Sequence, residues 1–231
     1  MGQLLSSTAE HEIEPIVGGK RVVIFIEGNI SAGKSTLIRT LREKGYMVEE
    51  EAVHIWTQDY VDENGKNILD LFYSDMNKNA FEMQIASLNT KWKSIRKVAQ
   101  SQQRVVFVER SLLTDIKTFA FLMHENKSLS KIQWKLYREL HEALELQMEE
   151  FFADIEVRYL YLRTDPIICL GRLQSRNRKE ESSIKLPYLE QLHAELDEWL
   201  VMNAQSCIDG AKNKEEVLEA VLNYVEALRL T

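Results

Sequence analysis

The sequence predicts a doubly wound α/β fold, in which helices flank a parallel sheet of about five strands. Two observations support this prediction. Short apolar runs rich in Val, Ile, Phe and Tyr alternate with longer segments of helical periodicity. In addition, a glycine-rich loop joins the first apolar run to the first helical segment, which is where such folds bind ligands.

The apolar runs are short and rich in β-branched residues, so we interpret each of them as a buried parallel strand. Three of the runs are pronounced, the second along the chain is weaker, and the last is faint. The predicted strands are Val22 to Ile26, Tyr46 to Glu50, Val105 to Val108, Val157 to Leu162 and Ser206 to Asp209.

The segments between and after these runs repeat their apolar residues at the spacing of an α-helix. This alternation of strand and helix is typical of a parallel sheet covered on both faces. The predicted helices are Lys34 to Lys44, Asn79 to Gln100, Ser111 to His124, Lys131 to Phe152, Pro166 to Arg176, Pro187 to Ala204 and Lys214 to Leu228.

Length and composition indicate one domain. With 231 residues, of which 45% are hydrophobic, the chain can bury one large core. We expect this domain to span residues 20 to 231 and to follow a flexible polar tail over residues 1 to 19. The net charge of −7 argues against binding of DNA or RNA, because polyanion binding needs Lys and Arg massed on one face.

The expected location is the cytoplasm. No apolar window is long enough to cross a bilayer, and two cysteines are too few for a disulfide framework. The first residues, MGQLLS, fit an N-myristoylation signal at Gly2, with a disordered tail as the alternative. No polybasic segment follows, and one acyl chain gives only marginal, reversible binding, so we do not expect stable membrane association.

The loop after the first predicted strand has the sequence GNISAGKST, which matches a phosphate-binding P-loop. Its glycines permit tight turns, its amides can point at phosphate oxygens, and the helix N-terminus adds partial positive charge. We expect Lys34 to bridge the β and γ phosphates and the Ser35 hydroxyl to face Mg²⁺. The predicted nucleotide-binding residues are Gly28, Asn29, Ile30, Ser31, Ala32, Gly33, Lys34, Ser35 and Thr36.

A P-loop alone does not name a reaction. A GTPase switch would need an Asn-Lys-x-Asp motif, and the nearest segment, residues 213 to 216, lacks the Asp. Residues 62 to 65 match Asp-x-x-Gly, but they follow no predicted strand, so a turn is the better interpretation. A nucleotide-dependent switch is therefore the weaker hypothesis.

Two further groups of charged residues follow predicted elements. Glu109 and Arg110 end a strand parallel to the one before the P-loop, where they could hold Mg²⁺ and steady a transferred phosphoryl group. The alternative is a solvated strand-to-helix junction. The cluster of Arg172, Arg176 and Arg178 is either a solvated face or a lid that closes over the phosphates.

Taken together, the sequence from about Arg21 to Leu200 resembles the deoxynucleoside kinase family. The motifs that carry the resemblance are IEGNISAGKST, EEAVHIW, ERS, and LRTDPIICLGRLQSRNRKEE followed by LPYLEQLH. The resemblance implies Mg²⁺-dependent transfer of the γ-phosphoryl of ATP, or of another triphosphate, to the 5′-hydroxyl of a deoxynucleoside in nucleotide salvage. It also implies that Glu51 is the general base, although Ala52 stands where the family pattern has Pro.

The resemblance further implies the residues that bind the acceptor. Tyr73 and Glu181 fall at the positions that contact the sugar 3′-hydroxyl, and Gln84 falls where an amide pairs with the base edge. Trp56 and Phe81 are the implied apolar walls. Arg110 is placed near the 5′-oxygen, Glu109 near Mg²⁺, and the three clustered arginines in the lid.

The resemblance also bears on the preferred base and on the oligomeric state. Lys91 stands where cytidine- and purine-preferring relatives carry Arg, and Asp115 matches their Asp, which favours deoxycytidine or purine deoxynucleosides. The family also implies a homodimer built through long helices, for which Ser111 to His124 and Lys131 to Phe152 are candidates. The alternatives are a nucleoside monophosphate kinase and, outside the kinases, a P-loop switch or assembly ATPase.

Overall fold

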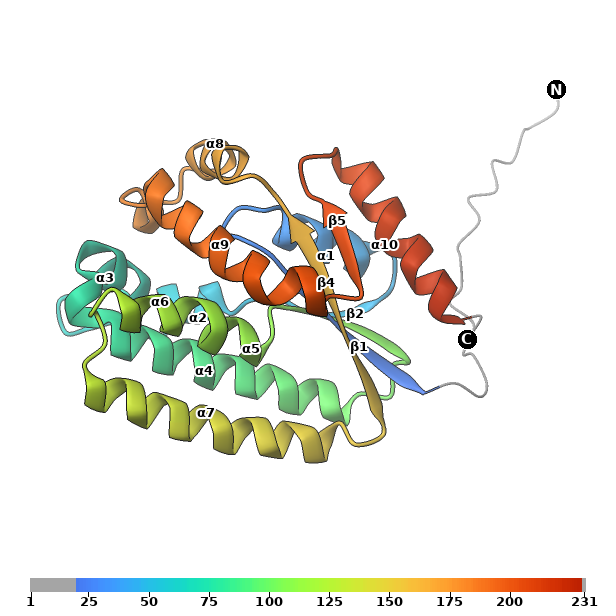
Figure 1. Ribbon diagram of the computed structural model, residues 1–231, viewed down its shortest axis with the longest axis horizontal. Coiled ribbons are helices and arrows are strands. Elements are labelled where there is room, and N and C mark those ends of the chain that lie inside the picture. The colour runs from blue at the N-terminus through green and yellow to red at the C-terminus, as the bar shows by residue number, and fades with distance from the viewer. Residues whose placement is uncertain (1–19, 230–231) are drawn as a thin grey trace, which may run out of the picture.

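The computed structural model describes residues 20–229 and confirms the parallel α/β fold (Figure 1). Within this range, five strands form one sheet in the order β2-β3-β1-β4-β5, and all the pairings are parallel. The predicted tail over residues 1 to 19 and the Gly2 signal lie outside the described residues. The strands are β1 (Arg21–Glu27), β2 (Met47–Glu49), β3 (Val105–Glu109), β4 (Ile155–Arg163) and β5 (Ser206–Asp209).

The first strand occupies the centre of the sheet. β1 pairs with β3 on one side, where Ile26 lies opposite Glu109, and with β4 on the other. The P-loop that follows β1 therefore starts beside the charged residues that end β3. This register produces the juxtaposition of phosphate loop and carboxylate that the sequence predicts.

Alternate residues of β1 point to opposite faces of the sheet, and each face has its own core. Val22, Ile24 and Ile26 pack against α1 (Lys34–Glu43) and α10 (Lys214–Arg229). Residues 23 and 25 belong to the larger core, which includes side chains of α4 (Met76–Gln100) and α9 (Leu186–Asn203). α7 (Lys131–Phe151) lies beyond α4, at the edge of the molecule (Figure 1).

Most predicted helices are confirmed with boundaries that differ by a few residues. α8 (Pro166–Arg176) matches its prediction, and the Asp165 side chain caps its first turn. α4 begins at Met76 rather than Asn79, because the Asp75 side chain accepts the backbone N–H of Lys78 and caps an earlier turn. Among residues 20–229, no helix combines the length and the apolar character needed to span a membrane.

The segment predicted as a helix from Ser111 to His124 is helical from residue 112 to 125, but it is not a uniform α-helix. The segment divides into α5 (Leu112–Thr114), a π-helical turn η1 (Asp115–Phe119) and α6 (Ala120–Glu125). Such π-helical turns widen a helix locally and are frequent at functional sites. Here the turn contains both Asp115 and Phe119, which line the cavity described below.

Three short elements have no counterpart in the prediction. They are α2 (Val53–Gln58), α3 (Ile68–Ser74) and the 3₁₀ turn η2 (Lys179–Glu181). Each is too short to show a helical period in sequence. The segment from residue 62 to 65 is a turn, as predicted, because the Asp62 side chain accepts the backbone N–H groups of Asn64 and Lys66.

Candidate active site

The loops that follow β1 and β3 line a cavity of about 570 Å³. The cavity brings together most of the residues that the sequence singles out, although they come from helices, strands and loops that are far apart in the sequence. Gly28, Asn29, Phe81 and Lys91 are the predicted residues that do not line it. The predicted residues that do are Ile30, Ser31, Ala32, Gly33, Lys34, Ser35, Thr36, Glu51, Trp56, Tyr73, Gln84, Glu109, Arg110, Asp115, Arg172, Arg176, Arg178 and Glu181.

The P-loop forms the floor of this cavity and requires glycine at two positions. Gly28 has φ +150°, and a Cβ atom there would lie 2.6 Å from the carbonyl oxygen of Leu162. Gly33 has φ +111° and precedes the first turn of α1. Ser31 also has positive φ, at 59°, so the loop holds a strained backbone of the kind found at phosphate-binding sites.

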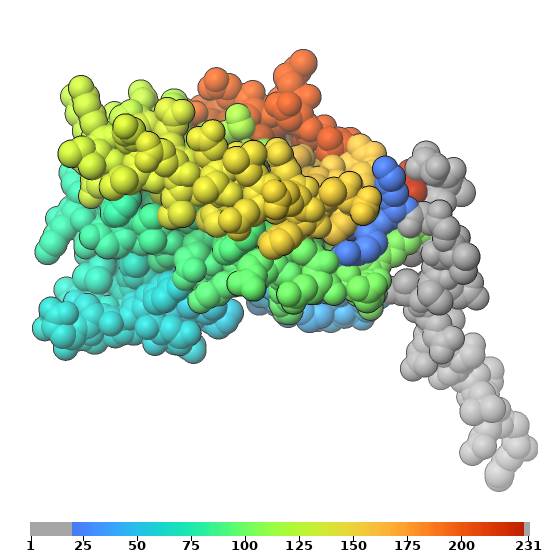
Figure 2. Space-filling model, turned by 90° about the horizontal axis from the view of Figure 1, so that it is seen from below, coloured from blue at the N-terminus to red at the C-terminus, as the bar shows by residue number. Residues whose placement is uncertain are grey.

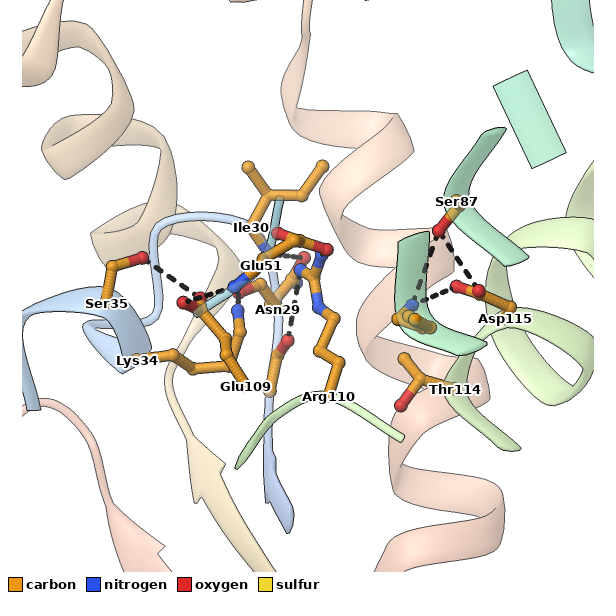
Figure 3. Close-up of polar contacts among 12 residues, drawn as sticks. Asn29, Ile30, Lys34, Ser35, Glu51, Ser87, Glu109, Arg110, Thr114 and Asp115 are labelled. Atoms are coloured by element: carbon orange, nitrogen blue, oxygen red, sulfur yellow. Dashed lines mark hydrogen bonds and ion pairs between the residues drawn. The ribbon is translucent and has the colours of Figure 1, made fainter. Parts of the chain in front are cut away.

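Asn29 fixes the loop from behind. Its side-chain amide donates to the carbonyl oxygen of Leu189 in α9 at 2.8 Å, and its side-chain oxygen accepts the N–H of Ile30 at 2.8 Å. Lys34 Nζ donates to the Asn29 carbonyl oxygen at 2.7 Å (Figure 3). Asn29 therefore holds the conformation of the P-loop and does not itself line the cavity.

Lys34 is buried, and burial lowers the pKa of its ammonium group from 10.5 to about 8, with the nearby Arg110 charge acting in the same direction. The carboxylates of Glu109 and Glu51 oppose this shift only in part. A cation with an incomplete set of counter-charges is well suited to accept the negative charge of phosphate groups.

An ion pair joins β3 to the loop after β2. Arg110 Nη1 donates to Glu51 Oε1 at 2.6 Å, and both side chains are largely shielded from water (Figure 3). Burial alone would raise the pKa of Glu51, but the charges of Arg110, Lys91 and Lys34 outweigh it and lower the pKa to about 2. Glu51 is therefore a carboxylate at neutral pH. The guanidinium of Arg110 also lies over the Phe119 ring, 4.7 Å from its centroid.

Ser35 and Glu109 offer oxygen atoms on the P-loop side of the cavity. The Ser35 hydroxyl donates to Glu109 Oε1 at 3.0 Å. Burial raises the pKa of Glu109, the Lys34 charge acts against this, and the neighbouring carboxylate of Glu51 adds to it. Within residues 20–229, no group of three or more His, Cys, Asp or Glu side chains could hold a metal by itself. One hydroxyl and one carboxylate fit Mg²⁺ that binds together with phosphates and water.

The opposite end of the cavity is built from α3, α4 and η1. Its apolar lining includes Leu69, Phe72, Met83 and Phe119, and the indole N–H of Trp56 is already bound to Thr90 Oγ1 at 3.1 Å. The side-chain oxygen of Gln84 is buried without a hydrogen-bond partner among the described residues. Gln84 is thus free to meet the polar edge of a planar ligand.

Lys91 lies behind this end of the cavity rather than in its lining. Its ammonium group is paired with Asp115 Oδ1 and lies 3.5 Å from the Ser87 hydroxyl, which itself donates to Asp115 Oδ2 at 3.0 Å. Ser87 and Asp115 line the cavity, so they are the polar groups next to Gln84. Phe81, predicted as an apolar wall of the cavity, is half-buried and packs on the core instead. Phe72 and Met83 line the cavity in its place.

The predicted lid arginines contact both ends of the site. Arg172 Nη1 donates to the Ala32 carbonyl oxygen of the P-loop at 2.8 Å. Arg176 and Arg178 both pair with the buried carboxylate of Glu181, the latter at 2.6 Å. Burial, followed by the nearby Tyr188 and Glu181, raises the pKa of Tyr73 well above its usual value, so the Tyr73 hydroxyl remains a hydrogen-bond donor.

Several residues that line the cavity were not predicted from the sequence. Ser87 lies one helical turn after Gln84, and that spacing is a signal that could have identified it. Phe72 and Phe119 sit in elements whose form the sequence does not predict. Arg39, Lys212 and Lys214 line the end of the cavity beyond the P-loop, and their sequence context carries no signal.

Comparisons with known proteins agree with this geometry. The family model for deoxynucleoside kinase matches residues 24–228. A fowlpox virus protein named "Probable deoxycytidine kinase FPV151" is 31% identical over 220 residues, which cover 89% of this chain and 88% of the relative. Human deoxycytidine kinase is 34% identical over 203 residues, covering 77% of this chain and 75% of the relative.

A further relative carries a different base in its name. The mitochondrial deoxyguanosine kinase of Xenopus laevis is 32% identical over 220 residues, which cover 88% of this chain and 81% of the relative. The match of the family model to nearly the whole described chain, together with these relatives, makes the assignment clear. The chain belongs to the deoxynucleoside kinase family.

Proposed function

We propose that this protein transfers the γ-phosphoryl group of ATP to the 5′-hydroxyl of a deoxynucleoside, with deoxycytidine or a purine deoxynucleoside as the acceptor. The observation that carries the proposal is the convergence of Glu51, Arg110 and Lys34 on one cavity. The P-loop end of that cavity suits a triphosphate, and the apolar end with Gln84 suits a nucleoside base. Its two ends match the two substrates of a nucleoside kinase.

In the proposed reaction, Glu51 orients the 5′-hydroxyl and accepts its proton as the new bond between the 5′-oxygen and the γ-phosphorus forms. The bond between the γ-phosphorus and the β,γ-bridging oxygen breaks, and the nucleoside diphosphate leaves. Arg110 and Lys34 offset the charge that develops on the transferred group. Because the pKa of Glu51 is low, proton transfer to it is expected late in the reaction.

Ser35 and Glu109 are the residues we propose for Mg²⁺, which would neutralise phosphate charge when bound. The donor nucleoside is proposed to occupy the end of the cavity lined by Arg39, Lys212 and Lys214. These side chains can attract a triphosphate of any base by charge alone. ATP as donor is supported by family membership rather than by a particular base contact.

The preference for the acceptor base rests on Gln84, Ser87 and Asp115. Asp115 presents a carboxylate, so an exocyclic amino group can donate to it, whereas the O4 atom of thymine would face it as a second acceptor. The relatives named for deoxycytidine and deoxyguanosine support the same preference. The alternatives are a nucleoside monophosphate kinase and a non-kinase ATPase.

A panel of four deoxynucleosides and their monophosphates tests the function. With ATP in a coupled assay, deoxycytidine or a purine deoxynucleoside should be phosphorylated, and thymidine should be slower by at least about 10²-fold in kcat/KM. Activity with monophosphates alone would favour the monophosphate kinase. ATP hydrolysis that is slow and unaffected by every nucleoside would favour the non-kinase hypothesis.

Glu51→Gln tests the assignment of the base. The amide keeps the shape of the side chain but cannot take the proton, so we expect turnover to fall roughly 10²- to 10⁴-fold while nucleotide binding stays near normal. The matched control is Glu50→Gln, because Glu50 is the adjacent carboxylate and pairs with Arg42 near the surface. If Glu50→Gln caused the larger loss, the base would be assigned to Glu50 instead.

The lowered pKa of Lys34 predicts the pH dependence of ATP capture. The charged ammonium group binds phosphate and loses its proton as pH rises through about 8, so kcat/KM for ATP should be level below pH 8 and decline above it. Glu51, with a pKa of about 2, should contribute no acid limb near neutrality. A Lys34→Arg variant, whatever its rate, should no longer show this decline in kcat/KM above pH 8, because arginine keeps its charge there. A decline that persists in the variant would contradict the assignment to Lys34.

We also propose a homodimer that forms through α7. Ile132, Leu136 and Leu140 recur every four residues on this helix and are 72%, 53% and 43% exposed. α7 runs across the outer surface beside α4, as the yellow band in Figure 2. An apolar stripe of this kind on a solvent-exposed face is typical of a protein–protein interface.

Analytical ultracentrifugation tests this proposal. The protein should sediment at twice the mass of the chain, and Leu136→Glu should shift it to the monomer, because a charge would be buried without a partner. Glu149→Lys changes a charge on another exposed side of the same helix and should leave the dimer intact. A monomeric protein at micromolar concentration would contradict the assignment.

A further inference from the structure

One fully buried carboxylate has no part in the chemistry proposed above. Glu27, the last residue of β1, is completely shielded from water, and no ion pair within 4.0 Å accompanies it in residues 20–229. Its oxygens accept two hydrogen bonds instead: the backbone N–H of Ser111 donates to Oε1 at 2.9 Å, and the Thr114 hydroxyl donates to Oε2. Burial of a carboxylate without a paired cation is costly, so its presence calls for a physical reason.

Both of these donors belong to the segment that directly follows Arg110. Arg110 itself has φ +63°, which is rare for a side chain of its size. Such a conformation persists only when its surroundings enforce it. Here the backbone N–H of Arg110 donates to the Ile26 carbonyl oxygen at 3.1 Å, and the next N–H along the chain donates to Glu27.

The guanidinium group is anchored to the same stretch of β1. Arg110 Nη2 donates to the Gly28 carbonyl oxygen at 3.4 Å, while Nη1 reaches Glu51 at 2.6 Å. The residues on both sides of Glu27 thus bind Arg110, through its backbone and through its side chain. Burial lowers the pKa of Arg110, but Glu51, Glu109 and, to a smaller extent, Glu27 outweigh it, so the net shift is upward.

We infer that Glu27 is a positioning residue for Arg110. Its carboxylate holds the junction between β3 and α5 in the left-handed conformation that directs the guanidinium of Arg110 to Glu51 and to the phosphoryl group in transfer. Glu27 does not touch either substrate, because it does not line the cavity. This inference rests on the proposed kinase function, in which Arg110 acts on the transferred group.

A double-mutant cycle tests the inference on the full-length protein. Glu27→Gln keeps the side-chain shape and removes the charge, and it should lower kcat about 10- to 100-fold while each KM changes less than about threefold. In an Arg110→Ala background, the same change should lower kcat by less than about threefold, because the group that it positions is gone. Glu27→Asp retains the charge on a side chain that is one methylene shorter, so its kcat should fall between those of Glu27→Gln and the wild type.

The controls separate positioning from loss of stability. Ser128→Ala removes one partly buried hydrogen bond to Asn77, and neither residue lines the cavity, so this change should alter the melting temperature but not kcat. If Glu27→Gln fails to fold, Thr114→Val replaces it in the same cycle, because this change removes one of the two hydrogen bonds to Glu27. Thr114→Val should lower kcat by less than Glu27→Gln, and this loss should also disappear in the Arg110→Ala background.

Two results would overturn the role of Glu27. One is an equal loss of kcat in both backgrounds, which indicates a general structural effect. The other is an unchanged kcat in a folded Glu27→Gln enzyme. Failure of the wild-type protein to phosphorylate any deoxynucleoside is a distinct outcome, because it overturns the proposed function and the inference with it.

Discussion

The parallel pairing of β1 with β3 is the constraint on which the rest of the site depends. Because Ile26 lies opposite Glu109, the P-loop and the Glu109–Arg110 pair emerge side by side from the sheet. A register shift of one residue would turn the side chains of the strand to the other face, so the two strands cannot slide without losing the core. The packing of Val22 to Ile26 on both faces therefore also fixes the position of the charges.

The site concentrates opposing charges in a space shielded from water. Lys34 and Arg110 are opposed by Glu51 and Glu109, and each of them has its pKa displaced by the others and by burial. Removing one member of such a set leaves an opposite charge buried without its partner, which costs stability. The same property suits phosphoryl transfer, in which charge moves within a fixed set of groups rather than through reorganised water.

Both ends of the cavity are also held by contacts to α8, η2 and α9. Glu181 pairs with Arg176 and Arg178, and Arg172 of the same segment binds the P-loop carbonyl of Ala32. Asn29 ties that loop to α9 through Leu189. The P-loop and the carboxylate of Glu181 are therefore both held by arginines of α8 and of the turn that follows it.

The sequence by itself determined the five parallel strands, the P-loop, and the charged edge at Glu109 and Arg110. Apolar periodicity and motif spacing are local properties, so they can be recognised without the fold. Only the tertiary structure decided that residues 115 to 119 form a π-helical turn, that Phe72 and Met83 form the wall in place of Phe81, and that Lys91 lies behind Ser87 and Asp115. The position of a side chain relative to a cavity depends on packing between segments far apart in the chain, and no local pattern records it.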